Sequence, residues 1–210
     1  MFENRKDAGR KLALKIKKTI GNSGYLVVGI VRGGVVLAKT IADCLNISLH
    51  ILVIRKIGVP FNRELAIGAV GSREIVYWDE DLIKRLKVSD AYRLLALKEK
   101  AREVENLEKI FSINKKGLDF RDKRVILVDD GVATGTTVLC AQKILKMQRP
   151  QQLILATPVI SQESFKNIKK YFDKIIVLEK PLRFWAVGQF YRDFPQVLDK
   201  EVIRILASSF

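Results

Sequence analysis

Five short runs of apolar, largely β-branched residues recur along the chain, and they limit its fold more than any other feature. They cover residues 25–31, 49–54, 125–128, 153–156 and 174–178. Such nearly continuous hydrophobicity is typical of strands buried on both faces, as in a parallel sheet. The segments with helical periodicity that separate most of these runs lie at 4–20, 35–45 and 161–171, with a further helix ending at Met147. The alternation predicts an α/β fold in which a mostly parallel sheet of about five strands is flanked by helices.

Residues 57–115 interrupt this alternation and form an insertion. Pro60 and several glycines in residues 57–73 predict a mobile loop that leads into a hairpin, with 75–78 as its second arm. A short helix at 79–87 and a long helix from about Asp90 to 113 should follow. The long helix is expected to pack through one face, made of Leu94, Leu97, Ala101, Val104, Leu107 and Phe111. With the C-terminal segment 180–210, this insertion should form a hood on a single domain that covers residues 1–210.

The charge and cysteine content narrow the class of protein. The 210 residues include 38 Lys and Arg against 23 Asp and Glu, which gives a net charge of +15. This surplus favours anionic partners such as phosphates or nucleic acid, but the basic residues are spread along the chain, so a lysine-rich surface is the favoured interpretation. Two cysteines exclude a disulfide scaffold and fit a cytoplasmic protein. No apolar run is long enough for a membrane helix, and the charged start of the chain is unlike a signal peptide.

The segment VILVDDGVATGTT, residues 125–137, carries the strongest chemical signal. A buried strand should deliver Asp129 and Asp130 to its carboxyl end, the edge where open α/β sheets bind ligands. Small and hydroxyl residues then turn the backbone into a helix N-terminus, whose free N–H groups can bind phosphate. Carboxylates beside a phosphate can accept hydrogen bonds from sugar hydroxyls or meet the phosphate through Mg²⁺. The pattern therefore predicts a ligand with a diol and a phosphate, such as a ribose 5-phosphate.

This segment resembles the phosphoribosyl-diphosphate (PRPP) binding motif of type I phosphoribosyltransferases. The resemblance implies their fold, and it implies that Asp129 and Asp130 hold the ribose hydroxyls and meet a metal only indirectly or through those hydroxyls. The residues that would surround the 5-phosphate are Ala133, Thr134, Gly135, Thr136 and Thr137. Members specific for hypoxanthine and guanine carry an Asp, their proposed general base, at the position of Ala133. Its absence here counts against that subclass.

The diphosphate of PRPP would lie at the ends of the first two strands. VRGG, residues 31–34, follows the first strand, where the family places its diphosphate loop, and the next strand ends in two basic residues. The resemblance assigns the diphosphate to Arg32, Gly33, Gly34, Arg55 and Lys56. Arg32 would join Asp129 and Asp130 as a catalytic residue, and the loop 57–73 would close over the reaction.

The tail FWAVGQFYRDF, residues 184–194, resembles the base-binding segment of purine phosphoribosyltransferases. By this resemblance Trp185 would stack on the acceptor, and the backbone of Ala186 and Val187 would lie along its edge. In the purine enzymes an acid further on contacts Mg²⁺, whereas here that place holds Arg192, followed by Asp193. Glu64 in the mobile loop could act on the leaving group, bind Mg²⁺ or cap the turn, and these alternatives stay open.

A closer resemblance covers nearly the whole chain. FENRKDAGRKLA, VRGGVVLA, IRKIGVPFNRELAIGAV, VILVDDGVATGTT, ATPV and FWAVGQFYRDFPQV occur in order, as in a group of bacterial and archaeal phosphoribosyltransferases whose acceptor is not established. One departure is Val31, where the group usually has Pro. The implied function is Mg²⁺-dependent transfer of ribose 5-phosphate from PRPP to a small, nucleobase-like acceptor by a homodimer. The alternatives are a non-catalytic regulator that senses PRPP and binds nucleic acid, and a ribose-phosphate hydrolase or phosphorylase.

Three other reactive side chains are expected to be structural. His50 stands alone in a predicted strand, so no catalytic role is assigned to it. Cys44 and Cys140 fall inside predicted helices and should be small core residues.

Overall fold

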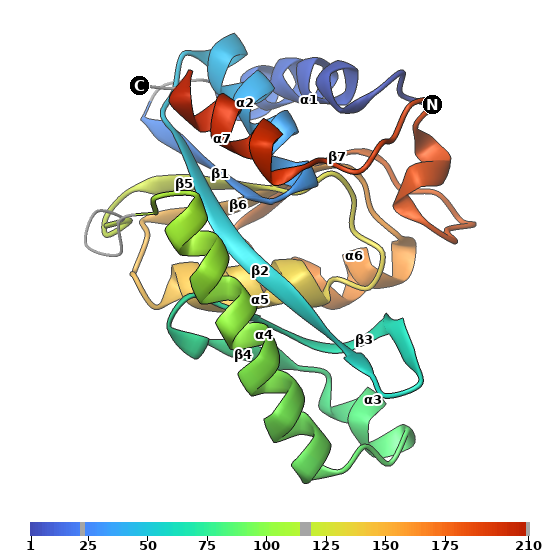
Figure 1. Ribbon diagram of the computed structural model, residues 1–210. Helices are drawn as coiled ribbons and strands as arrows, with labels where there is room; N and C mark the ends of the chain where they lie inside the picture. Colours follow the sequence, from blue (N-terminus) through green and yellow to red (C-terminus); the bar gives the residue numbers. More distant parts are fainter. Residues whose placement is uncertain (22–23, 114–118, 209–210) are drawn as a thin grey trace.

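A mixed sheet of seven strands organises the part of the chain that the structure describes. This computed structural model describes residues 1–21, 24–113 and 119–208, without the side chains of residues 63 and 64 (Figure 1). The strand order is β4-β3-β2-β1-β5-β6-β7. The five parallel strands are β1 (Tyr25–Val31), β2 (Leu49–Val59), β5 (Arg124–Val128), β6 (Gln152–Val159) and β7 (Lys174–Glu179). The prediction of an α/β fold with a mostly parallel sheet is confirmed, and the sheet has seven strands where about five were predicted.

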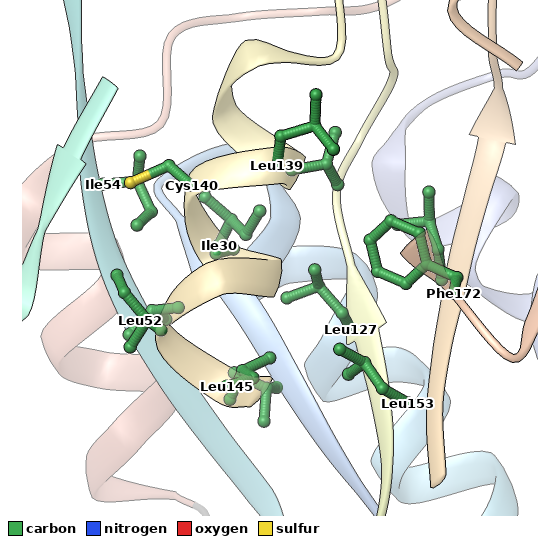
Figure 2. Packing of buried hydrophobic residues seen from close by; sticks show 14 of the residues in the cluster. Ile30, Leu52, Ile54, Leu127, Leu139, Cys140, Leu145, Leu153 and Phe172 are labelled. Atoms are coloured by element: carbon green, nitrogen blue, oxygen red, sulfur yellow. The ribbon is translucent and has the colours of Figure 1, made fainter. Parts of the chain in front are cut away.

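Helices cover both faces of this sheet. α1 (Arg5–Ile20) and α2 (Gly33–Leu45) pack on one face, where Val27, Ile126 and Ile154 are fully buried. α5 (Thr136–Lys146) and α6 (Gln162–Ile168) lie on the other face. Figure 2 shows how side chains of α5 interdigitate there with alternate residues of the strands, such as Leu127. Strands buried on both faces account for the continuous apolar runs in the sequence.

The segment 57–73 differs from its prediction. Instead of a mobile loop, β2 continues to Val59 and forms an antiparallel hairpin with β3 (Asn62–Gly71), which pairs in turn with β4 (Val76–Trp78). Register shifts on either side of Gly58 mark an irregular pairing. Ile57 and Ile67 are fully buried, so the hairpin is stabilised by packing as well as by its hydrogen bonds. The glycines and Pro60, which suggested a loop, are accommodated within the strands and at the turn.

The insertion continues with α3 (Glu80–Arg85) and the long helix α4 (Asp90–Ile110). α4 crosses β2 and β3 (Figure 1) and buries Val104 and Leu107 against them, while Phe111 is buried just beyond its end. The prediction is wrong for Leu94, which is exposed. At about 100° per residue, Leu94 lies about 140° around the helix from Leu107, whereas Ala96 lies on the buried stripe.

The C-terminal segment contacts two parts of the domain, first the N-terminal segment and then α2. After the 3-10 helix η3 (Val187–Phe190), the chain pairs with the N-terminal segment, where the Phe2 amide donates to the Phe190 carbonyl at 2.7 Å. Arg192 donates its amide to the Phe2 carbonyl at 2.8 Å, and its side chain forms an exposed ion pair with Glu3. The last helix, α7 (Asp199–Ala207), crosses back to α2 (Figure 1).

The remaining structural predictions have mixed outcomes. Cys140 is buried as expected, but Cys44 is exposed on the outer side of α2, so its prediction as a core residue is wrong. His50 is half-buried, with its ring edge-on to Phe120 at 5.8 Å between centroids. No helix in the described ranges is both long and apolar enough to cross a bilayer.

Candidate active site

A cavity of about 440 Å³ opens at the carboxyl ends of β1 and β5, beside residues 54–56 in the middle of β2. Its volume lies in the range of sites for small molecules and cofactors. The predicted site residues that line it are Arg32, Gly33, Arg55, Lys56, Asp129, Asp130, Thr134, Gly135, Thr137 and Val187. Topology thus brings one segment from each of three parallel strands, together with part of the tail, around a single space.

The loop before α5 is fixed by hydrogen bonds to the end of β6 and to the start of α6. The Val132 amide donates to the Val159 carbonyl at 2.9 Å, and the Ala133 carbonyl accepts hydrogen bonds from the hydroxyls of Ser161 and Ser164. Gly135 precedes the helix with φ +83°, a left-handed conformation that favours glycine. It provides no side-chain cap, so the first N–H groups of α5 remain available to an anion.

Asp129 and Asp130 lie at the end of β5, between this loop and the start of α2. Burial, and secondly the charge of Asp130, raises the pKa of Asp129 to about 8, while Lys56 and Arg5 oppose the rise. Burial also raises the pKa of Asp130, against the opposing effect of Arg5. Two adjacent carboxyl groups are therefore held where burial disfavours their ionised forms, which suits a ligand that brings hydroxyl donors or a cation.

Arg5 is a site residue that the sequence analysis missed. Its Nε donates to Asp130 Oδ2 at 2.8 Å, its Nη1 donates to the Pro195 carbonyl at 2.7 Å, and its guanidinium lies 3.6 Å from the ring centroid of Phe194. The hydroxyl of Tyr191 donates to the backbone carbonyl of Asp130 at 2.6 Å. A signal was present in the sequence, because Arg5 lies one heptad before Leu12 and so falls on the buried stripe of α1.

Gly33 and Gly34 are close to the acid pair, although they belong to the predicted diphosphate loop. A β-carbon on Gly33 would overlap the Asp130 carboxylate, and one on Gly34 would lie 2.6 Å from the Val128 carbonyl. The peptide bond between Val31 and Arg32 is cis. The glycines therefore let the start of α2 approach the end of β5.

Two basic side chains of the cavity are paired with acids that the sequence analysis did not single out. Arg32 forms two hydrogen bonds to Asp199 of α7, from Nε at 2.7 Å and from Nη2 at 3.3 Å. The Nε of Arg55 lies 3.4 Å from Oε2 of Glu103 on α4, within ion-pair distance but without hydrogen-bond geometry. Lys56 is exposed at the cavity, and no ion pair joins it to another described residue.

The predicted acceptor segment is only partly at the cavity. Val187 lines it and packs on the loop before α5 so closely that a β-carbon on Gly131 would overlap its side chain. Trp185 is 79% exposed and does not line the cavity, and its amide and that of Ala186 donate to Oε1 of Gln189. The roles of Trp185 and Ala186 therefore stay predictions. The side chain of Glu64 lies outside the described part of the structure.

The acid pair also bears on a metal ion. No cluster of three or more His, Cys, Asp or Glu side chains able to hold a metal occurs in the described ranges. Mg²⁺ commonly uses only one or two protein carboxylates and takes its other ligands from substrate oxygens and water. Asp129 and Asp130, whose pKa values are raised mainly by burial, fit such a shared site.

Comparison with known proteins assigns the chain to a family. The family model described as "Phosphoribosyl transferase domain" matches residues 2–195, so the chain belongs to this family. Two Mycobacterium tuberculosis proteins from different strains, provisionally named phosphoribosyl transferases, are 32% identical over 206 residues. That alignment covers 98% of this chain and 46% of theirs, so the chain spans about half the length of these relatives.

Two solved structures have a similar fold. Protein TT1426 of Thermus thermophilus has 30% identity and a TM-score of 0.81, with 99% of this chain and 98% of that chain covered. A Neisseria gonorrhoeae protein solved with bound ppGpp has 12% identity and a TM-score of 0.51, covering 100% and 99% of the two chains. The second likeness concerns the fold alone.

Proposed function

We propose that the protein transfers ribose 5-phosphate from PRPP to a small, nucleobase-like acceptor and releases diphosphate. One observation carries this proposal. A single cavity brings together an acid pair, an open helix N-terminus, a glycine turn that adjoins the acid pair, and basic side chains. These groups complement, in order, the hydroxyls, the 5-phosphate and the diphosphate of one molecule of PRPP.

Each part of the site has a physical role in this reaction. Asp129 and Asp130 accept hydrogen bonds from the ribose hydroxyls and favour the positive charge that develops on the ring. The amides at the start of α5 hold the 5-phosphate. Arg32, Arg55 and Lys56 stabilise the negative charge of the departing diphosphate. When bound, Mg²⁺ would neutralise further charge on the diphosphate, and Asp129 and Asp130 would hold it through PRPP.

The acceptor segment 184–194 completes the proposal, with Trp185 stacked on the acceptor once it is bound. The lack of an acid at Ala133 disfavours hypoxanthine and guanine as acceptors. A cytoplasmic homodimer belongs to the same proposal.

The direct test is a screen of nucleobases and amines for PRPP-dependent release of diphosphate in the presence of Mg²⁺. We expect one acceptor class to raise diphosphate release well above the rate with PRPP alone. Release at the same rate without any acceptor would instead indicate a hydrolase. PRPP binding without release for any acceptor would favour a PRPP-sensing regulator.

A second candidate function, binding of nucleic acid, is favoured by the charge of α1. This helix carries seven basic residues and one acid, Asp7. The six exposed basic residues are Lys6, Arg10, Lys11, Lys15, Lys17 and Lys18. None of them is among the residues that line the described cavity, so the basic surface and the cavity are separate. A shift of random duplex DNA or RNA whose log–log salt dependence is steeper than about −4 would support this function.

A further inference from the structure

The diphosphate end of the cavity is built from two acid–base pairs that link four separate elements. Arg32, at the start of α2, is bound by Asp199 through two hydrogen bonds. Arg55, on β2, lies within ion-pair distance of Glu103, which also accepts a hydrogen bond from Lys100. Each of the two arginines thus has an acidic side chain within ion-pair distance.

Both acids are brought to the arginines by elements outside the parallel sheet. Glu103 belongs to α4, which is anchored by the neighbouring buried residue Val104. Asp199 is the first residue of α7, whose Val202 is fully buried. α7 begins beyond residue 195, where the match to the family ends. Apolar packing of the two helices therefore holds each carboxylate close to a basic residue of the cavity.

Arg55 shows that these acids satisfy the basic residues only in part. Its Nε is buried and has no hydrogen-bond partner among the described residues, even though Glu103 is 3.4 Å away. Burial lowers the pKa of Arg55, and the charge of Arg32 lowers it further. An unsatisfied buried donor beside a cavity, with two guanidinium groups close enough to affect each other, favours a ligand with several anionic oxygens.

We propose that Asp199 and Glu103 are counter-ions that release Arg32 and Arg55 to the oxygens of diphosphate when it binds, and reclaim them when it leaves. The proposal rests on the proposed function, because it takes this end of the cavity as the leaving-group subsite. Both acids oppose the binding of an anion by direct repulsion and by competition for the arginines. They act on diphosphate through the two arginines, and by doing so they weaken the product complex and promote diphosphate release.

The test is titration calorimetry with inorganic diphosphate and Mg²⁺ on Asp199→Asn and Glu103→Gln variants of the full chain. Each substitution removes one negative charge and keeps the shape of the side chain. We expect each to lower the Kd for diphosphate by about 3- to 10-fold, and the double variant to lower it further. In the transfer reaction, inhibition by added diphosphate should strengthen by a similar factor, and the KM for PRPP should fall.

Matched controls separate this effect from a general change of charge. Asp43→Asn breaks the Lys39–Asp43 pair on α2, and Glu105→Gln breaks the pair with Lys109 on α4. Neither acid lines the cavity, so both variants should bind diphosphate like the wild type. A role of Asp199 and Glu103 in merely keeping the arginines in place predicts the opposite sign, namely weaker binding.

The outcomes are distinguishable. Unchanged or weaker diphosphate binding by both variants, with wild-type unfolding temperatures, would overturn the inference and leave the proposed function intact. If Asp199→Asn destabilises α7, the Glu103→Gln variant still tests the inference, because the sequence of α7 is unchanged in Glu103→Gln. Absence of diphosphate and PRPP binding by the wild-type protein would instead overturn the proposed function.

Discussion

The two ends of the cavity are built in different ways. At the proposed ribose-phosphate end, backbone groups of one contiguous segment are fixed by hydrogen bonds to β6 and α6, and no side chain caps the start of α5. At the diphosphate end, side chains from β2 and α2 are paired with acids from α4 and α7. On the proposed function, the first end is ready for its ligand, whereas the arginines of the second end exchange their acidic partners for the ligand.

This difference suggests how binding and release could be divided between the ends. A preorganised cradle loses little on binding, so it can supply most of the affinity for PRPP. A subsite whose basic residues already have partners gains less from the diphosphate, which suits a group that must leave after the reaction. The ribose-phosphate end should therefore be the more sensitive to substitution.

The largest effect is expected when both acids of the ribose site are neutralised. Asp129→Asn with Asp130→Asn should abolish PRPP-dependent turnover, by about 1,000-fold or more, because both acceptors for the ribose hydroxyls lose their charge. The fold should persist, since neutral amides replace half-buried carboxyl groups of similar shape. Diphosphate release and circular dichroism measure the two expectations. Unchanged turnover in a folded double variant would exclude the assignment of this site.

Arg5 should have the next largest effect. Arg5→Ala leaves Asp130 without its buried ionic partner, and we expect PRPP affinity to fall by about 100-fold, with a loss of about 2–4 kcal/mol in stability. Calorimetric titration with PRPP and urea unfolding measure these changes. Arg10→Ala, on the exposed side of the same helix, is the matched control and should change neither quantity. Wild-type PRPP affinity in Arg5→Ala would show that Asp130 is positioned without Arg5.

The same difference explains how much could be predicted from the sequence. The acid pair and the phosphate loop lie in residues 125–137, where strand, acids and helix start follow one another, so local chemistry indicates the site. The ionic partners are far apart in sequence. Arg5 and Asp130 are separated by 125 positions, and Arg32 and Asp199 by 167. No local pattern predicts such pairs, because the tertiary fold alone brings them together.

The fold shows the same limit. The five parallel strands were predicted because strands that are buried on both faces consist of continuous apolar runs, which are visible in the sequence. The β2–β3 hairpin was predicted as a loop because its glycines and Pro60 weaken the local strand signal, while its stability comes from α4 and α5 packed across it. Leu94 was placed in the core because a single helix does not reveal which of two neighbouring stripes its partner covers.

The pH dependence of stability tests how strained the acid pair is in the ligand-free protein. The pKa of Asp129 is raised from 3.8 to about 8, so folding favours its protonated form. Its contribution to stability is present below about pH 4 and is lost as the pH rises through 8. Asp129→Asn should therefore raise the free energy of unfolding by about 1–3 kcal/mol at pH 9, with little change near pH 4.

Urea unfolding at the two pH values measures this difference, with Asp43→Asn as the exposed control. Equal stability of Asp129→Asn and the wild type at pH 9 would show that Asp129 ionises there without penalty. The ribose-phosphate end would then be less demanding than its burial indicates, and the contrast between the two ends would weaken.

Trp185 should have the smallest effect on PRPP. It is 79% exposed and lies outside the cavity lining, so Trp185→Ala should leave PRPP affinity and the unfolding temperature close to wild type. If Trp185 stacks on the acceptor, the same variant should raise the KM of the acceptor found by screening, by about 5- to 100-fold, because stacking contributes about 1–3 kcal/mol per base. Trp185→Phe should restore part of that loss. A change in PRPP affinity without a change in acceptor KM would show that Trp185 contacts the sugar and not the acceptor. The tail would then belong functionally to the preorganised end of the cavity, where Val187 already packs on Gly131.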